Sequence, residues 1–153
     1  MTNARLPRQG TKDTVFLAYA FGVEIDHLVH AVFSEVSGLE AKMEVEEYKE
    51  GGLNGFTWKF PGRVSFTNVT LKWGTQYSSA LWDWYETFVK SERKERRSVD
   101  IIQFDASHVE KRRWTLERAF PVKWSGPAFN SANTQIPVES IELAFEDLVF
   151  VKS

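Results

Sequence analysis

Hydrophobic and charged residues alternate without interruption from residue 39 to residue 46. The odd positions are apolar and the even positions are charged: Leu39, Ala41, Met43 and Val45 against Glu40, Lys42, Glu44 and Glu46. A period of two residues is typical of a β-strand with one buried and one solvated face. The pattern therefore predicts a strand whose apolar side is covered and whose charged side meets water.

Similar alternation predicts six further strands, in residues 15–25, 28–37, 63–73, 99–105, 113–124 and 136–151. In two of these segments the apolar residues change parity, at Asn68 in the first and after Phe145 in the second. Such a change is typical of a bulge or a sharp twist that carries a strand from one sheet to another. In residues 113–124 the apolar residues keep one parity, interrupted only by Arg118.

One segment, residues 78–92, has the period of a helix. Its large apolar residues follow the spacing i, i+3, i+4, i+7: Leu81, Trp84, Tyr85 and Phe88. This spacing predicts an amphipathic helix, with Ser78 or Ser79 as its N-cap. Residues 1–13 are polar and predict a flexible arm, followed by a single domain over residues 14–153. The fold class predicted is mainly β: an antiparallel sandwich or barrel of about six or seven strands with one α-helix.

Composition narrows the function classes. The chain of 153 residues has six Trp, twelve Phe and four Tyr, no Cys, and a formal net charge of −2. The charge does not suit a protein that binds nucleic-acid phosphates, and without cysteine there are no disulfides. No window approaches the roughly 20 apolar residues of a membrane span, and the first residues lack the apolar core of a signal peptide. We expect a protein made in the bacterial cytoplasm without a signal peptide.

Candidate catalytic and metal-binding groups have simpler interpretations. His27 and His30 are three residues apart, which places them on opposite faces of a strand. Glu44 and Glu46 resemble a catalytic carboxylate pair, but acids at alternate positions of one strand are more simply a solvated wall. The sequence therefore predicts no catalytic residues, no metal site and no cofactor, and a protein that is not an enzyme.

Several short motifs, in order along the chain, carry a resemblance to a known family. They are FSEVSGLE (33–40), EYKEGG (47–52), FPG (60–62), FTNVTLKWG (66–74), LWDWY (81–85), RRSVDIIQFD (96–105), AFPVKWSGP (119–127) and VESIELAFEDL (138–148). The ordered set resembles the inner-tube proteins of contractile phage tails and of phage-tail-like contractile injection systems. Phe145 and Asp147 depart from the family pattern, which often has His and Gly there.

The resemblance implies a structural subunit that forms hexameric rings, which stack into a tube with a hydrophilic lumen inside a contractile sheath. The partners it implies are other copies of the chain, the sheath protein, a baseplate or tube-initiator protein, and cargo or DNA in the lumen, with no insertion of the subunit into a membrane. A Gly-rich loop closed by Phe-Pro-Gly is expected to reach a neighbouring subunit or ring: Glu50, Gly51, Gly52, Leu53, Asn54, Phe60, Pro61 and Gly62. The candidate lumen-facing residues are Glu40, Lys42, Glu44 and Glu46, and the candidate interface residues are Trp82, Phe145 and Asp147.

Two other functions stay open at this point. An aromatic-rich monomeric β-barrel that binds a small ligand fits the strand pattern. A glycosidase that uses Glu44 and Glu46 is the second alternative. The sequence does not distinguish a phage tail from a bacteriocin or an injection system, nor a bulk tube protein from a tube-initiating paralogue.

Overall fold

The computed structural model describes residues 20–26, 28–52, 55–74, 79–128, 131–132 and 137–151. These residues form ten strands and one helix: β1 (Ala20–Ile25), β2 (Leu28–Phe33), β3 (Glu35–Ser37), β4 (Ala41–Tyr48), β5 (Trp58–Phe66), β6 (Val69–Gly74), α1 (Ala80–Lys90), β7 (Arg97–Phe104), β8 (Glu110–Ser125), β9 (Val138–Ala144) and β10 (Asp147–Val151). The mainly β fold class with one helix is confirmed. More strands are present than expected because the longer predicted segments break in two. The predicted arm, residues 1–13, lies outside the described residues.

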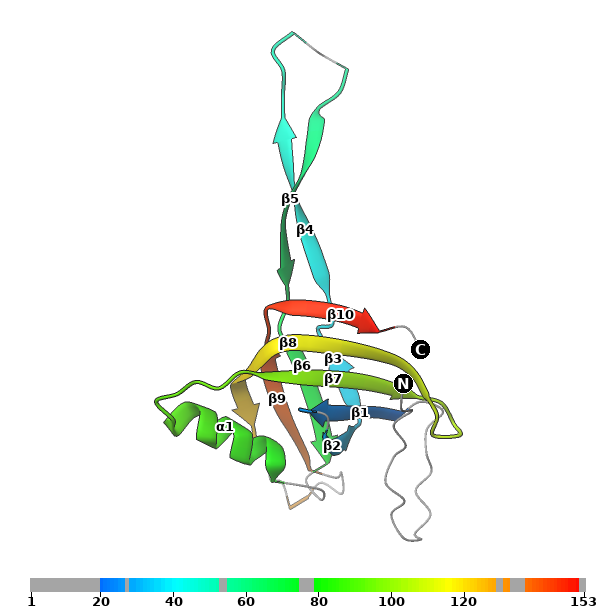
Figure 1. Cartoon of the computed structure of the whole chain (residues 1–153), viewed down its shortest axis with the longest axis vertical. Coiled ribbons are helices and arrows are strands. Elements are labelled where there is room, and N and C mark those ends of the chain that lie inside the picture. Colours follow the sequence, from blue (N-terminus) through cyan, green and yellow to red (C-terminus); the bar gives the residue numbers. More distant parts are fainter. Residues whose placement is uncertain are drawn as a thin grey trace.

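Eight of the described strands form one curved antiparallel sheet, the body of the molecule (Figure 1). Its order is β2-β1-β7-β8-β9-β6-β3, and β10 pairs with β8. The strands at the two ends of this order, β2 and β3, are separated in sequence only by Ser34. The Ser34 amide donates to the Lys72 carbonyl of β6 at 2.9 Å. The sheet therefore curls until its two ends approach each other, as in a barrel.

Strand β8 belongs to both halves of this curved sheet. Its first part pairs with β7 and β10, and its last part, from Phe120 to Ser125, pairs with β9. Arg118 lies at the junction with a φ of 54°, inside a bulge opposite β7. Leu116 and Ala119, on the two sides of this bulge, are both buried. The apolar residues of one parity in residues 113–124 therefore do not form a single buried face, because the bulge inserts a residue where β8 passes from one half of the sheet to the other.

The two parity changes that the sequence predicts are real breaks. Asn68 lies between β5 and β6, and Glu146 lies between β9 and β10. After the first break the chain joins different partners: β5 pairs with β4, whereas β6 pairs with β3 and β9 inside the body. After the second break the chain stays beside β8, because β9 pairs with the last part of β8 and β10 pairs with its first part. The first parity change thus marks a change of neighbouring strand, and the second marks the point where the chain passes from one part of β8 to the other.

The core fills the inside of the curved sheet. Most of its fully buried residues come from five body strands: Val23, Val69, Leu71, Val99, Ile101, Leu116, Ala119, Ile141 and Leu143. Helix α1 adds Leu81 and Trp84, and its Phe88 stacks on Phe120 with ring centroids 5.5 Å apart. The predicted apolar face of the helix is thus confirmed. Ser79 occupies the N-cap position, although its hydroxyl donates to the Asp83 carboxylate at 3.0 Å instead of capping the backbone.

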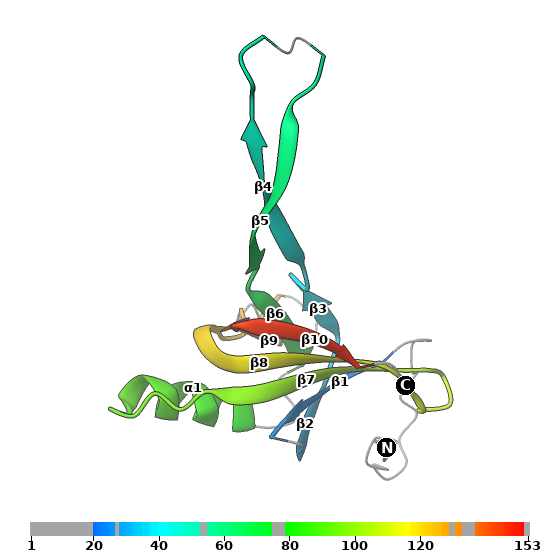
Figure 2. The ribbon, with the colours of Figure 1, turned by 45° about the horizontal axis from the view of Figure 1, so that its top comes forward.

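Strands β4 and β5 form a separate two-stranded hairpin that projects from the body (Figures 1 and 2). The chain leaves the body at Gly38, whose φ is +83°. A Cβ atom at Gly38 would lie 2.2 Å from the Asn68 carbonyl oxygen, so only glycine fits there. The Thr67 hydroxyl donates to the Gly38 carbonyl at 2.7 Å and links the two chain segments at the base of the hairpin.

Candidate assembly surface

The hairpin exposes an unusual amount of apolar surface. Seven of its large apolar side chains are 45–59% exposed: Met43, Val45, Tyr48, Phe56, Trp58, Phe60 and Val64. The sequence predicts that one face of residues 39–46 is buried, and this prediction was wrong beyond Leu39, which packs partly against the core. The alternation is real, but within the described residues no second layer covers the hairpin.

The hairpin contains a β-bulge. Met43 pairs with Val64, and the next pair, Val45 with Pro61, is displaced by one residue. Gly62 and Arg63 therefore both lie opposite Glu44. A Cβ atom on Gly62 would lie 2.8 Å from the Glu44 carbonyl oxygen, closer than real Cβ contacts come.

The predicted loop is shorter than expected. Phe60, Pro61 and Gly62 lie inside β5 and do not close a loop, because the bulge lets the strand continue through them. Gly51 and Gly52 form the turn at the tip, where Gly52 has a φ of +101°. Glu50 is exposed near this turn, and Leu53 and Asn54 lie outside the described residues. That this region reaches a neighbouring subunit stays a prediction.

The four candidate lumen residues lie on or beside the hairpin. Lys42, Glu44 and Glu46 are exposed on one pleat face of β4, and Glu40 is exposed just before the strand. On the same pleat face, β5 places Ser65 opposite Lys42 and Phe60 opposite Glu46. This face is therefore charged near the body and partly aromatic toward the tip.

The three candidate interface residues have different surroundings. Trp82 is 36% exposed and packs edge-on against Trp124, with ring centroids 4.5 Å apart. Phe145 is half-buried against Phe66 at 5.4 Å and contributes to the core. Asp147 is exposed at the start of β10. Trp82 and Asp147 are thus available at the surface, whereas Phe145 mostly supports the base of the hairpin.

Strand β10 is a second exposed apolar element. Among the described strands it pairs only with β8, so its other side is an edge. Val149 is 38% exposed and Phe150 is 47% exposed. An apolar edge strand is a typical site for pairing with another chain.

The sheet of the body also carries a buried ion cluster. The Arg113 guanidinium contacts three carboxylates at 2.7–2.8 Å, those of Glu24, Asp100 and Glu110. The side chains are at most 16% exposed. Hydrogen bonding to Glu110, and then the bond and charge of Glu24, raise the pKa of Arg113 far above its usual value. The cluster joins β1, β7 and β8 and resembles a structural clamp more than a reactive site.

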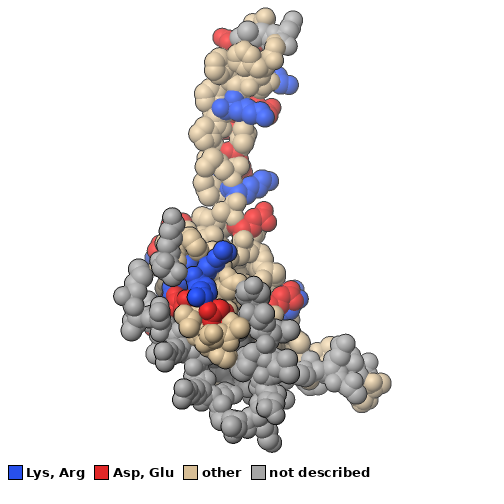
Figure 3. Space-filling model, turned by 90° about the vertical axis from the view of Figure 1, so that its right-hand side faces the viewer, with Lys and Arg blue, Asp and Glu red and all other residues tan. Residues whose placement is uncertain are grey.

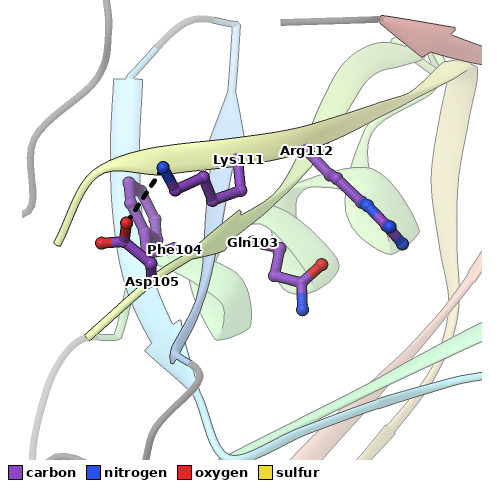
Figure 4. A pocket seen from close by; sticks show the side chains of 5 residues that line it. All are labelled: Gln103, Phe104, Asp105, Lys111 and Arg112. Atoms are coloured by element: carbon purple, nitrogen blue, oxygen red, sulfur yellow. Dashed lines mark ion pairs between the residues drawn. The ribbon is translucent and has the colours of Figure 1, made fainter. Parts of the chain in front are cut away.

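A hollow of ≈ 350 Å³ lies near the turn between β7 and β8 (Figure 4). Lys111 and Asp105 line it and form an ion pair of 3.1 Å. The Val109 amide, together with Lys111 and the Ser107 amide, lowers the pKa of Asp105. Both charges are thus already engaged. Among the described residues no group of His, Asp or Glu side chains has the arrangement of a metal site, and no helix is long and apolar enough to cross a membrane.

Sequence reasoning missed most of the aromatic residues of the hairpin. Tyr48, Trp58 and Phe60 lie together near its tip and line one hollow with Glu50. Phe56 packs edge-on against Trp58 at 5.1 Å. The available signal was the alternation of large apolar residues from 56 to 60, which continues the strand pattern into the segment that we interpreted as loop.

Comparison with known proteins gives a consistent result. The family described as T4-like virus tail tube protein gp19 matches residues 17–149. A chain in the cryo-EM structure of the extended sheath–tube complex of PVC, an extracellular contractile injection system, is 25% identical, with a TM-score of 0.76, over 87% of this chain and 88% of that chain. No protein with a curated description is similar enough to count as a match.

Two more distant structures share the fold. A chain in the six-fold symmetrised baseplate of the anti-feeding prophage is 20% identical, with a TM-score of 0.74, over 94% of this chain and 98% of that chain. Hcp1 from Salmonella typhimurium is 15% identical, with a TM-score of 0.55, over 88% of this chain and 93% of that chain. The similarity thus extends over nearly all of each molecule.

Proposed function

The chain belongs to the T4-like virus tail tube protein gp19 family, and we propose that it is the repeating subunit of the inner tube of a contractile injection system or contractile phage tail. Copies form hexameric rings, and the rings stack into a tube inside a contractile sheath. The partners are other copies of the chain, a sheath protein, a baseplate or tube initiator, and cargo or DNA in a hydrophilic lumen. Its role is structural and not enzymatic.

The hairpin is the observation that carries this proposal. An isolated two-stranded ribbon is marginally stable in water, and this one exposes seven large apolar side chains. A monomer gains nothing from that surface, whereas an assembly buries it. The exposed edge of β10 supports the same conclusion, because pairing between copies satisfies its unpaired backbone groups.

The ligand-binding barrel finds no comparable support. Such a protein needs an enclosed apolar cavity. Here the inside of the curved sheet is filled by buried residues such as Leu71, Trp73 and Ile141. The glycosidase alternative is equally weak, because Glu44 and Glu46 lie on one exposed ribbon with no opposing wall among the described residues.

Assembly of the purified chain tests the proposal directly. We expect light scattering after gel filtration to detect hexamers or larger species, and negative-stain microscopy to show rings or tubes. Deletion of residues 51–54 should leave the circular dichroism spectrum and melting of the body unchanged but stop tube growth. A wild-type chain that stays monomeric at every concentration contradicts the proposal, and normal tubes from the deletion variant contradict the role of the tip.

A further inference from the structure

Apolar side chains occupy opposite pleat faces in the two halves of the hairpin. Near the body the apolar pairs are Ala41 with Phe66 and Met43 with Val64. Toward the tip the apolar pair is Tyr48 with Trp58, which lies on the other pleat face because its positions differ in parity from Met43. On a flat ribbon these residues would form two separate patches on opposite sides.

The ribbon is not flat. The two strands exchange sides between the base and the tip in both ribbon views (Figures 1 and 2). Two-stranded ribbons twist more strongly than larger sheets, and a bulge increases the local twist. When a ribbon turns over, the pleat face that points to one side at the base points to the opposite side at the tip. If the apolar residues also change pleat face along the strand, they stay on the same side of the ribbon in space.

The charged residues follow the complementary path. Lys42 and Glu44 lie near the base, and the pair of Glu47 with Lys59 lies near the tip on the opposite pleat face. Glu46 lies between these two groups, on the pleat face of Lys42 and opposite Phe60. In Figure 3 the left-hand edge of the hairpin below its tip is mostly uncharged, and the Lys, Arg, Asp and Glu side chains lie mostly on its front and right-hand edge.

We infer that the bulge at Gly62–Arg63 converts the twisted hairpin into a ribbon with one continuous apolar side, and that this side docks onto a second copy of the chain. Without the bulge, Phe60 and Trp58 would lie on the same pleat face as Val64. Because the ribbon twists, they would then point to the opposite side of the hairpin in space. With the bulge they change face and join Tyr48. This inference rests on the proposed function, and it specifies which side of the hairpin makes the contact and which residue sets that side.

The size of the apolar side suits a partner protein. Four of its side chains are aromatic and about half exposed: Tyr48, Phe56, Trp58 and Phe60. With about 150–250 Å² per aromatic side chain, they offer about 400 Å². In a stable interface each partner buries about 800 Å², so these four side chains supply about half of the area that one partner needs. A second copy is the occupant that a tube always provides, and its own body exposes apolar residues on β10.

Paired substitutions test the geometry. Met43→Lys and Phe60→Lys lie on opposite pleat faces but on the same side in space, and each should reduce the assembled fraction about tenfold or more. Lys42→Glu and Lys59→Gln are the matched controls on the charged side and should assemble normally. A loss with only one of the first two variants overturns the inference, since it means that a single pleat face makes the contact.

The glycine test addresses the bulge itself. Gly62→Ala should lose assembly while the body keeps its melting temperature, because the added Cβ meets the Glu44 carbonyl. Gly55→Ala is the control, since a Cβ there has no atom within 4 Å. Normal tubes from Gly62→Ala overturn the role of the bulge.

The partner is identified by crosslinking. The chain contains no cysteine, so Met43→Cys and Phe60→Cys each give a single site for a maleimide–benzophenone crosslinker. With a mixture of ¹⁵N-labelled and unlabelled copies, both sites should yield hybrid-mass dimers. Crosslinks that stay within one copy, or that require an added different protein, overturn the inference while wild-type assembly leaves the proposed function intact. A monomeric wild-type chain removes both.

Discussion

The body and the hairpin show the same sequence pattern and opposite burial. In β6 the alternating residues Val69, Leu71 and Trp73 are at most 2% exposed. In β4 the alternating residues Met43 and Val45 are more than half exposed. The difference is that β6 lies in a sheet that curls around a core, whereas β4 and β5 stand alone. Alternation thus specifies that one face needs cover, and the surroundings decide whether the same chain provides it.

The largest expected difference between the two regions comes from two tryptophans. Trp73→Ala should lower the free energy of unfolding by about 3–5 kcal/mol, because Trp73 is buried against Phe33 with ring centroids 5.7 Å apart. Trp58→Ala should lower it by less than about 1 kcal/mol, because that side chain is 45% exposed. Urea unfolding of unassembled protein measures both. Equal losses would mean that the hairpin packs onto its own body in solution.

Two arginines give the next contrast. Arg113→Met should lower the free energy of unfolding by about 3 kcal/mol, because it leaves Glu24, Asp100 and Glu110 as buried acids without their shared guanidinium. Arg63→Met in the exposed bulge should change it by less than about 0.5 kcal/mol. Thermal unfolding followed by circular dichroism compares them. An unchanged melting temperature for Arg113→Met would show that the cluster does not clamp the sheet.

The smallest contrast concerns two glycines with positive φ. Gly38→Ala should lower the free energy of unfolding by about 1–3 kcal/mol, because the new Cβ meets the Asn68 carbonyl in addition to the backbone strain. Gly52→Ala should lower it by about 1 kcal/mol or less, because only the strain applies and no atom lies within 4 Å. Chemical denaturation of both variants separates the two terms. A larger loss at Gly52 would indicate that the tip contacts the body.

Prediction from the sequence succeeded where the period and the partner both lie nearby in the chain. The helix face of Leu81, Trp84 and Phe88 depends only on residues within two turns, and the structure confirms it. The break at Asn68 was visible as a change of parity. The bulge at Arg118 was not visible, because apolar residues continue at the same parity after it and only the pairing of β8 with two different neighbours requires it.

The sequence by itself determined which residues alternate, where the helix lies and that the chain resembles a tail-tube protein. Only the tertiary structure decided that residues 41–66 leave the sheet as a hairpin, since burial depends on contacts between segments far apart in the chain. It likewise decided which side of that hairpin is apolar, because the side in space is set by twist and by the bulge at Gly62 together. Neither quantity can be read from a period of two.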